Sequence, residues 1–160
     1  MGETTLKSVE KSFMVGSITT TQSTDVTTDD HIKYDNIIAS RGDNITLDTG
    51  TSYTKTLDVA SVGRITLQPN IDYKLTAIVR AGFPAAGGVT IYWRNSDTGV
   101  RIGSKINTNA SDNTGTVSHG NIVLTYFKPT SDTRIEISIE SGGNISSFSS
   151  DDCEFFIEEI

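Results

Sequence analysis

Residues that commonly act as bases and nucleophiles near neutral pH are few in this chain, and none lies in a catalytic pattern. His31 and His119 are the two histidines, and Cys153 is the single cysteine. Hydrolytic catalysis needs a nucleophile, a base and an orienting acid, so we expect both histidines to be loop or surface residues. Cys153 opens a strand-like segment and is predicted to be a small buried hydrophobe.

Metal and phosphate motifs are also missing from the sequence. There is no phosphate-binding glycine loop and no Cys/His ligand spacing. Carboxylates and hydroxyls cluster in residues 23–30 and 149–152, but their spacing matches no calcium loop and indicates solvated turns. The Arg41–Asp43 tripeptide, RGD, is predicted to close a turn between two strands. The sequence therefore predicts no enzyme activity, no cofactor and no metal site.

Composition and charge exclude two further classes of partner. The net charge is −7 and Lys and Arg are scattered, so there is no basic stripe for nucleic acid and none for an anionic membrane. Residues 1–20 lack the apolar core of a signal peptide, and every apolar run is too short to span a bilayer. We expect a protein made in a cytoplasm and not inserted in a membrane. With one cysteine, the domain is held by packing or by oligomerisation.

Short alternating segments separated by turn residues dominate the chain after Phe13. They predict an all-β, antiparallel jelly-roll sandwich of about ten strands. Residues 80–88 and 107–120 are predicted to be long loops, and residues 3–13 form a weak helical stripe or a tether. The predicted strands cover residues 14–22, 31–40, 44–48, 52–59, 64–68, 72–81, 88–95, 99–106, 120–128, 133–141 and 153–160.

The last predicted strand, CEFFIEEI, is apolar on both faces. Phe155 and Ile157 point to one side, and Phe156 and Ile160 point to the other. One side faces the core of the domain, so the other side needs a cover. A neighbouring subunit is the simplest cover.

Tyr92 and Trp93 are adjacent on one strand and are expected to face opposite sides of their sheet. Two interpretations remain open. One ring packs in the core and the other makes a subunit contact, or an exposed ring stacks on a sugar.

Several segments, taken in order, resemble the tumour-necrosis-factor-like and complement-like jelly-roll domains of bacteriophage fibres and head-attached proteins. These segments are YDNIIASRGDNITLDT, GRITLQPNIDYKLTAIVRA, IYWRNSDTGVRIGS, LTYFKPTSDTRIEISIESGGNISS and the terminal FFIEEI. The most telling are the Trp-bearing strand that leads through a short turn to IGS, and the alternating strand after a Thr/Pro turn. Together they extend over residues 12–160.

The resemblance implies a homotrimer whose subunits pack the sheet of the first and last strands around a three-fold axis. Tyr73, Tyr126, Phe155 and Ile157 are then expected near that axis or in the core beneath it. It also implies attachment to a virion through residues 1–13, where Leu6, Val9 and Phe13 would form the anchor. The jelly-roll domain would span residues 14–160.

Under this resemblance the chain is a non-enzymatic structural protein of a phage particle, made in the host cytoplasm. It would be a head fibre, a capsid decoration or a tail-fibre tip, with capsid or tail proteins as partners. Its loops could contact a glycan or protein of the host surface. The alternative is a carbohydrate-binding β-sandwich module, which predicts a monomer with Tyr92 or Trp93 exposed in a groove.

Overall fold

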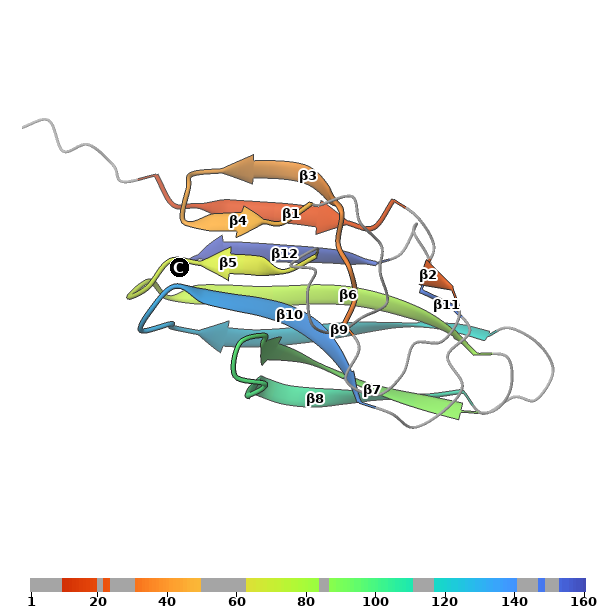
Figure 1. The fold of residues 1–160 in the computed structure, drawn as a ribbon. Coiled ribbons are helices and arrows are strands. Elements are labelled where there is room, and N and C mark those ends of the chain that lie inside the picture. The colour runs from red at the N-terminus through yellow and green to blue at the C-terminus, as the bar shows by residue number, and fades with distance from the viewer. Residues whose placement is uncertain are drawn as a thin grey trace, which may run out of the picture.

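The computed structural model describes residues 10–19, 22–23, 31–49, 63–83, 87–110, 117–140, 147–148 and 153–160. These residues form two antiparallel β-sheets packed face to face, and none of them is helical (Figure 1). The predicted all-β jelly-roll sandwich is therefore confirmed. Leu6, Val9 and the predicted strand at residues 52–59 lie outside the described residues.

The described strands are mostly short, and two of them contain two residues each. In chain order they are β1 (Phe13–Ser17), β2 (Gln22–Ser23), β3 (Asn36–Arg41), β4 (Ile45–Leu47), β5 (Ile65–Leu67), β6 (Tyr73–Phe83), β7 (Gly87–Asn95), β8 (Arg101–Ala110), β9 (Val117–Phe127), β10 (Thr133–Glu140), β11 (Ser147–Phe148) and β12 (Glu154–Glu159).

In the seven-stranded sheet, the first and last strands of the described chain, β1 and β12, pair with each other in the interior of the sheet. Its main run is β9, β6, β12, β1 and β3, with β11 paired to β6 and β2 paired to β11. The five-stranded sheet has the order β4, β5, β10, β7 and β8. Most neighbouring strands are not consecutive in the chain, because the jelly roll winds the chain between the two sheets; β4–β5 and β7–β8 are the consecutive pairs among the described strands.

Alternating side chains from both sheets fill the space between them. In β6, the inward row is Tyr73, Leu75, Ala77 and Val79, and all four are buried. In β10, Ile135, Ile137 and Ile139 form the opposing row. Trp93 lies in the same core and donates a hydrogen bond from Nε1 to the Val123 carbonyl, at 3.4 Å.

Four strands extend further than the sequence predicted. β6 continues to Phe83 and β7 begins at Gly87, so the predicted loop at residues 80–88 is mostly strand. β8 continues to Ala110 and β9 begins at Val117. The ends of these strands are polar and do not alternate, so the sequence does not mark them as strand. They are strand in the structure because each one pairs with a long neighbouring strand.

Residues 31–35 differ most from the prediction. They were expected to begin a strand, but only His31 forms a bridge, to Ser138 of β10. The segment then crosses from the five-stranded sheet to the seven-stranded one and reaches β3 (Figure 1).

Ile32 and Tyr34 are buried in the core, and the Tyr34 ring meets the Phe155 ring edge to face, with centroids 4.8 Å apart. Burial raises the pKa of the Tyr34 hydroxyl well above 10.0.

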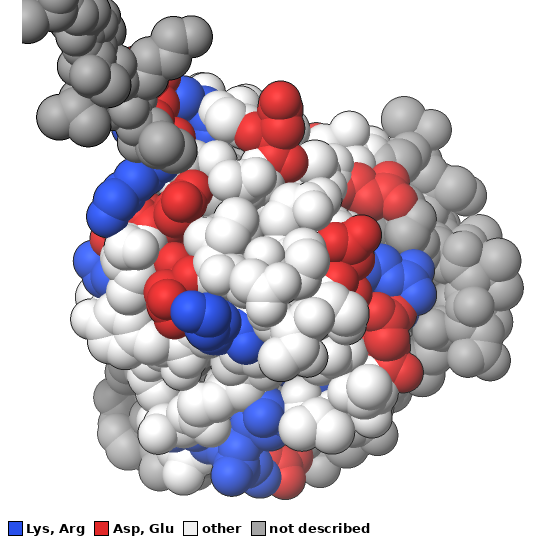
Figure 2. All heavy atoms as spheres, turned by 90° about the vertical axis from the view of Figure 1, so that its left-hand side faces the viewer, with Lys and Arg blue, Asp and Glu red and all other residues white. Residues whose placement is uncertain are grey.

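The short turns and the two ends of the described chain lie together at one end of the sandwich (Figure 1). Glu159 accepts a hydrogen bond from the Ser12 amide and returns one from its own amide to the Ser12 carbonyl, at 3.0 and 2.9 Å. Figure 2 views this end and shows acidic and basic side chains interspersed with uncharged ones. As predicted, residues 41–43 close the turn between β3 and β4, and Gly42 has a φ of 74°.

Candidate subunit interface on the seven-stranded sheet

The side chains of the seven-stranded sheet that point away from the core form ordered rows across its strands. We call this surface the outward face. Strand register places Leu124, Thr76, Phe156, Val15 and Ala39 side by side in its central row. The flanking rows are Ile122, Ile78, Glu154, Ser17 and Asn36 on one side, and Tyr126, Lys74, Glu158, Phe13 and Arg41 on the other.

Apolar side chains dominate the central row and extend into both flanking rows. Tyr126 is 62% exposed, Ile122 59% and Leu124 47%. Phe13, Val15 and Phe156 are half-buried beside them. Single exposed apolar residues are common on soluble proteins, but contiguous apolar patches usually mark interaction sites.

Lys74 and Glu158, which are neighbours in one flanking row of the outward face, form an ion pair. Lys74 Nζ lies 2.7 Å from Glu158 Oε1, and this hydrogen bond raises the pKa of Lys74 above 10.5. At the edge of the sheet, the Arg41 guanidinium lies over the Phe13 ring, 5.4 Å from its centroid. Paired charges at the margin of an apolar surface are typical of the rim of a protein interface.

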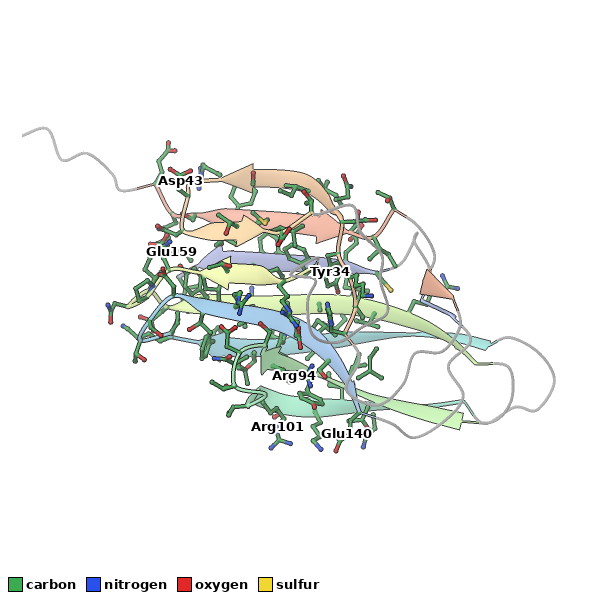
Figure 3. The ribbon with its side chains drawn as sticks, in the orientation of Figure 1. Tyr34, Asp43, Arg94, Arg101, Glu140 and Glu159 are labelled. Carbon is green, nitrogen blue, oxygen red and sulfur yellow. The ribbon has the colours of Figure 1, made fainter. Side chains whose placement is uncertain are left out.

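The outward side of the five-stranded sheet carries ion pairs instead. Glu136 is fully buried there, and it accepts hydrogen bonds from Arg64 Nε at 3.1 Å and Arg94 Nε at 2.9 Å. Arg134 pairs with Asp97 close by. Figure 3 shows Arg94, Arg101 and Glu140 on this layer.

His31 belongs to the Glu136 cluster. It lies outside the named strands, as a loop residue would, but it is buried, so it is not a surface histidine. Its Nδ1 lies 3.8 Å from Glu136 Oε2. The bridge to β10 holds His31 there, and a long-range pairing of this kind cannot be read from local sequence. His119 lies within β9 rather than in a loop.

The four residues predicted near a three-fold axis divide into two groups. Tyr73, Phe155 and Ile157 are buried in the core of the single chain, beneath the outward face. Tyr126 lies on the outward face itself. A direct subunit contact at this face would therefore involve Tyr126, with the other three supporting the sheet from behind.

Tyr73 supports the sheet by tying the turns at the end of the sandwich. Its hydroxyl donates to the carbonyl of Asn44 at 3.1 Å, with the Gln68 carbonyl at 3.3 Å. Burial raises the pKa of this hydroxyl to about 12. Cys153 is buried in the same core, as predicted.

Phe13 is the one predicted anchor residue that the structure describes. It begins β1 and its ring lies on the outward face, under Arg41. Arg41 also donates from Nε to the Lys11 carbonyl at 3.1 Å, so the chain enters β1 in a fixed direction.

Tyr92 and Trp93 do face opposite sides of β7, but neither offers a ring for stacking on a sugar. Trp93 is fully buried in the core. Tyr92 is 8% exposed, and Lys105 Nζ lies over its ring, 5.8 Å from the centroid.

Sequence reasoning did not single out Ile78, Ile122 or Leu124 as interface residues. The signal was present, because these residues alternate with the buried rows of β6 and β9. A strand apolar on both faces predicts cover on both faces, and that argument was applied only to β12.

Within the described ranges, no group of three or more His, Cys, Asp and Glu residues lies close enough to hold a metal ion. The same part of the chain contains no helix long and apolar enough to cross a membrane. In Figure 3, Asp43 lies at the β3–β4 turn, while Tyr34 lies nearer the middle of the sandwich.

Comparison with known proteins resolves the fold but not the family. No protein-family profile matches the chain, and no curated protein matches it in sequence. Among solved structures, murine APRIL at pH 5.0 superposes with a TM-score of 0.61 at 12% identity, covering 94% of this chain and 100% of that one. Eiger TNF from S. frugiperda gives 0.58 at 9% identity, covering 94% and 91%.

The chain has a TNF-like jelly-roll fold. Both neighbours align over nearly the whole chain, so the likeness extends across both sheets. At such low identity it is a likeness of fold alone.

Proposed function

We propose that the chain is a non-enzymatic structural protein that assembles as a homotrimer through the outward face. The observation that carries the proposal is the contiguous apolar surface over β9, β6, β12 and β1. A second copy is the favoured occupant, because the same surface is then buried in every subunit. Three copies arranged around an axis form a closed assembly with no unpaired surface left.

The proposed place of this trimer is a bacteriophage particle, as a head fibre, a capsid decoration or a tail-fibre tip. The support is the resemblance of the ordered sequence segments to phage jelly-roll domains, together with the fold. Residues 1–13 would attach the trimer to capsid or tail proteins. The chain enters β1 beside the outward face, so three attachment segments would leave a trimer at one end. The opposite end would then face away from the particle, toward a host surface.

Light scattering on a sizing column tests the assembly. We expect a mass of about three times 17.2 kDa, roughly 50 kDa. Substitution of Leu124→Glu should return the mass to that of one chain, because a charge would be buried without a partner in each contact. Val100→Glu is the matched control, since Val100 is exposed in the β7–β8 turn. A single-chain mass for the unmodified protein would contradict the proposal.

Immunogold labelling of purified virions from the source of the gene tests the location. Labelling of the particle surface is the expected result. A trimer that is absent from the particles would leave the assembly standing and refute the virion role.

A further inference from the structure

The edge of the seven-stranded sheet at β3 differs from the edges of an ordinary soluble sandwich. β3 pairs with β1 on one side, and no other described strand pairs with it. It lies at the upper margin of the sandwich in Figure 1. Residues 37–41 are all exposed. The backbone of an edge strand presents donors and acceptors that another strand can pair with.

Natural proteins protect such edges with charged side chains, proline or bulges. In β3, residues 36–40 include no charge and no proline. The strand does contain one bulge-like irregularity, because Val15 pairs with Ala39 and Gly16 with Ile37, which leaves Ile38 without a partner on β1. Arg41 is the one charge in the strand, and its guanidinium is held by the Lys11 carbonyl and the Phe13 ring.

Two adjacent isoleucines add exposed apolar surface to this edge. Ile38 is 53% exposed and Ile37 is 41% exposed. A strand laid against β3 would cover part of each side chain, in addition to completing backbone hydrogen bonds.

We propose that β3 of one copy pairs antiparallel with β3 of a second copy, so that one sheet continues across two subunits. The contact is isologous, with the same strand on both sides of a two-fold axis. With the axis between Ile38 and Ala39, each Arg41 lies opposite Asn36 of the other copy, and no like charges meet. β3 contains no acidic residue, so the contact itself adds no repulsion between carboxylates of two chains whose net charge is −7 each.

A six-residue strand buries less than the roughly 1,000 Å² expected of a stable interface, so a single contact of this kind is weak. Its effect grows where several edges act together. An assembly with three β3 edges would join others through repeated contacts, at high effective concentration. The proposal goes beyond trimer formation, because it concerns contact between assemblies. It uses the backbone edge of β3, whereas the trimer uses side chains of the outward face.

Sedimentation velocity over a range of protein concentration tests the proposal. The unmodified protein should form species larger than its basic oligomer as the concentration rises. Ile38→Lys should abolish this rise, because two lysines would be brought together at the two-fold axis. Val100→Lys introduces the same charge at another exposed aliphatic residue and should associate as the unmodified protein does. Thermal unfolding of each variant checks that the fold is intact.

A cysteine at the edge gives a second measurement. Cys153 is buried, so Ile38→Cys supplies the exposed thiol. Under mild oxidation it should cross-link two chains faster than Val100→Cys does.

The outcomes separate this proposal from the trimer. Association of Ile38→Lys equal to that of the unmodified protein would overturn it, as would equal cross-linking of the two cysteine variants. If the unmodified protein is a monomer at low concentration and Ile38→Cys still cross-links two chains faster than Val100→Cys, the trimer is refuted and the β3 contact is supported.

Discussion

The outward sides of the two sheets carry different kinds of side chain. On the five-stranded sheet, buried Glu136 is held by two arginines, and Arg134 forms an exposed ion pair with Asp97. On the seven-stranded sheet, isoleucine, leucine and aromatic side chains are left in solvent. The first surface satisfies its own groups within one chain. The second leaves apolar side chains uncovered within one chain, and this difference is the reason we propose that the seven-stranded sheet is the side that assembles.

The largest effect is expected from a charge in the centre of the outward face. Phe156 lies in the central row between Thr76 and Val15. Phe156→Glu should weaken trimer assembly by at least about a thousandfold, because each contact would bury an unpaired carboxylate at a cost of several kcal/mol. Sedimentation equilibrium measures the change. Normal assembly of this variant would show that the outward face is not the contact, and Ser104→Glu on exposed β8 serves as the control.

The next effect concerns the ion cluster of the other sheet. Glu136→Gln leaves Arg64 and Arg94 without their carboxylate and should lower the free energy of unfolding by about 3 kcal/mol. Asp97→Asn removes an exposed partner of Arg134 and should cost about 0–1 kcal/mol. Urea denaturation compares the two. Equal losses in the free energy of unfolding for the two variants would mean that the buried Glu136 cluster stabilises the fold no more than an exposed ion pair does.

A smaller effect is expected at Gly16, which lets β1 lie close to the core. A Cβ there would overlap the Phe155 ring and come within 2.9 Å of the Asn36 carbonyl oxygen. Gly16→Ala should therefore cost about 1–3 kcal/mol through overpacking. Thermal unfolding measures it, with Thr46→Ala at an exposed position of β4 as the control. An unchanged melting temperature would show that β1 can move away from Phe155.

The smallest effect is a dependence on alkaline pH. In the folded chain the pKa of Tyr73 is about 12, above its ordinary value of 10.0. Between these values the unfolded chain loses a proton that the folded chain keeps, so stability is full below pH 10 and falls as the pH rises toward 12. Tyr73→Phe should reduce this fall, to which the raised pKa of buried Tyr34 also contributes, and should cost about 1 kcal/mol at neutral pH through the lost hydrogen bond. Urea denaturation at pH 8 and 11 measures the loss of stability between these two pH values. An equal loss in Tyr73→Phe and in the unmodified protein would show that Tyr73 is not responsible.

Much of the fold could be predicted because alternation is a local signal. Ile135, Ile137 and Ile139 face the core as their spacing indicates. The crossing segment at residues 31–35 could not be predicted, because Ile32 and Tyr34 read as one more strand until the bridge to β10 is known. The burial of Glu136 could not be predicted for the same reason, because its arginine partners lie 72 and 42 residues away in sequence.

The outward face was predicted in part. Alternation in β12 indicated a covered second side, but the row that Phe156 joins depends on which strands are neighbours. Pairing of β6 with β9 brings Ile78 beside Ile122, and no local pattern contains that register. Of the four residues predicted near the axis or in the core beneath it, Tyr126 lies on the face, and Tyr73, Phe155 and Ile157 lie in the core.

The position of β1 has a mechanical consequence. β1 is flanked by β12 on one side and β3 on the other, and Arg41 and Glu159 bind the backbone where the chain enters it. Tension applied through the preceding residues would pull along the strand and load both ladders of hydrogen bonds in shear. Bonds loaded together must break together, whereas bonds at a peeled edge break in turn. A domain tethered through β1 is thus built to resist being pulled away.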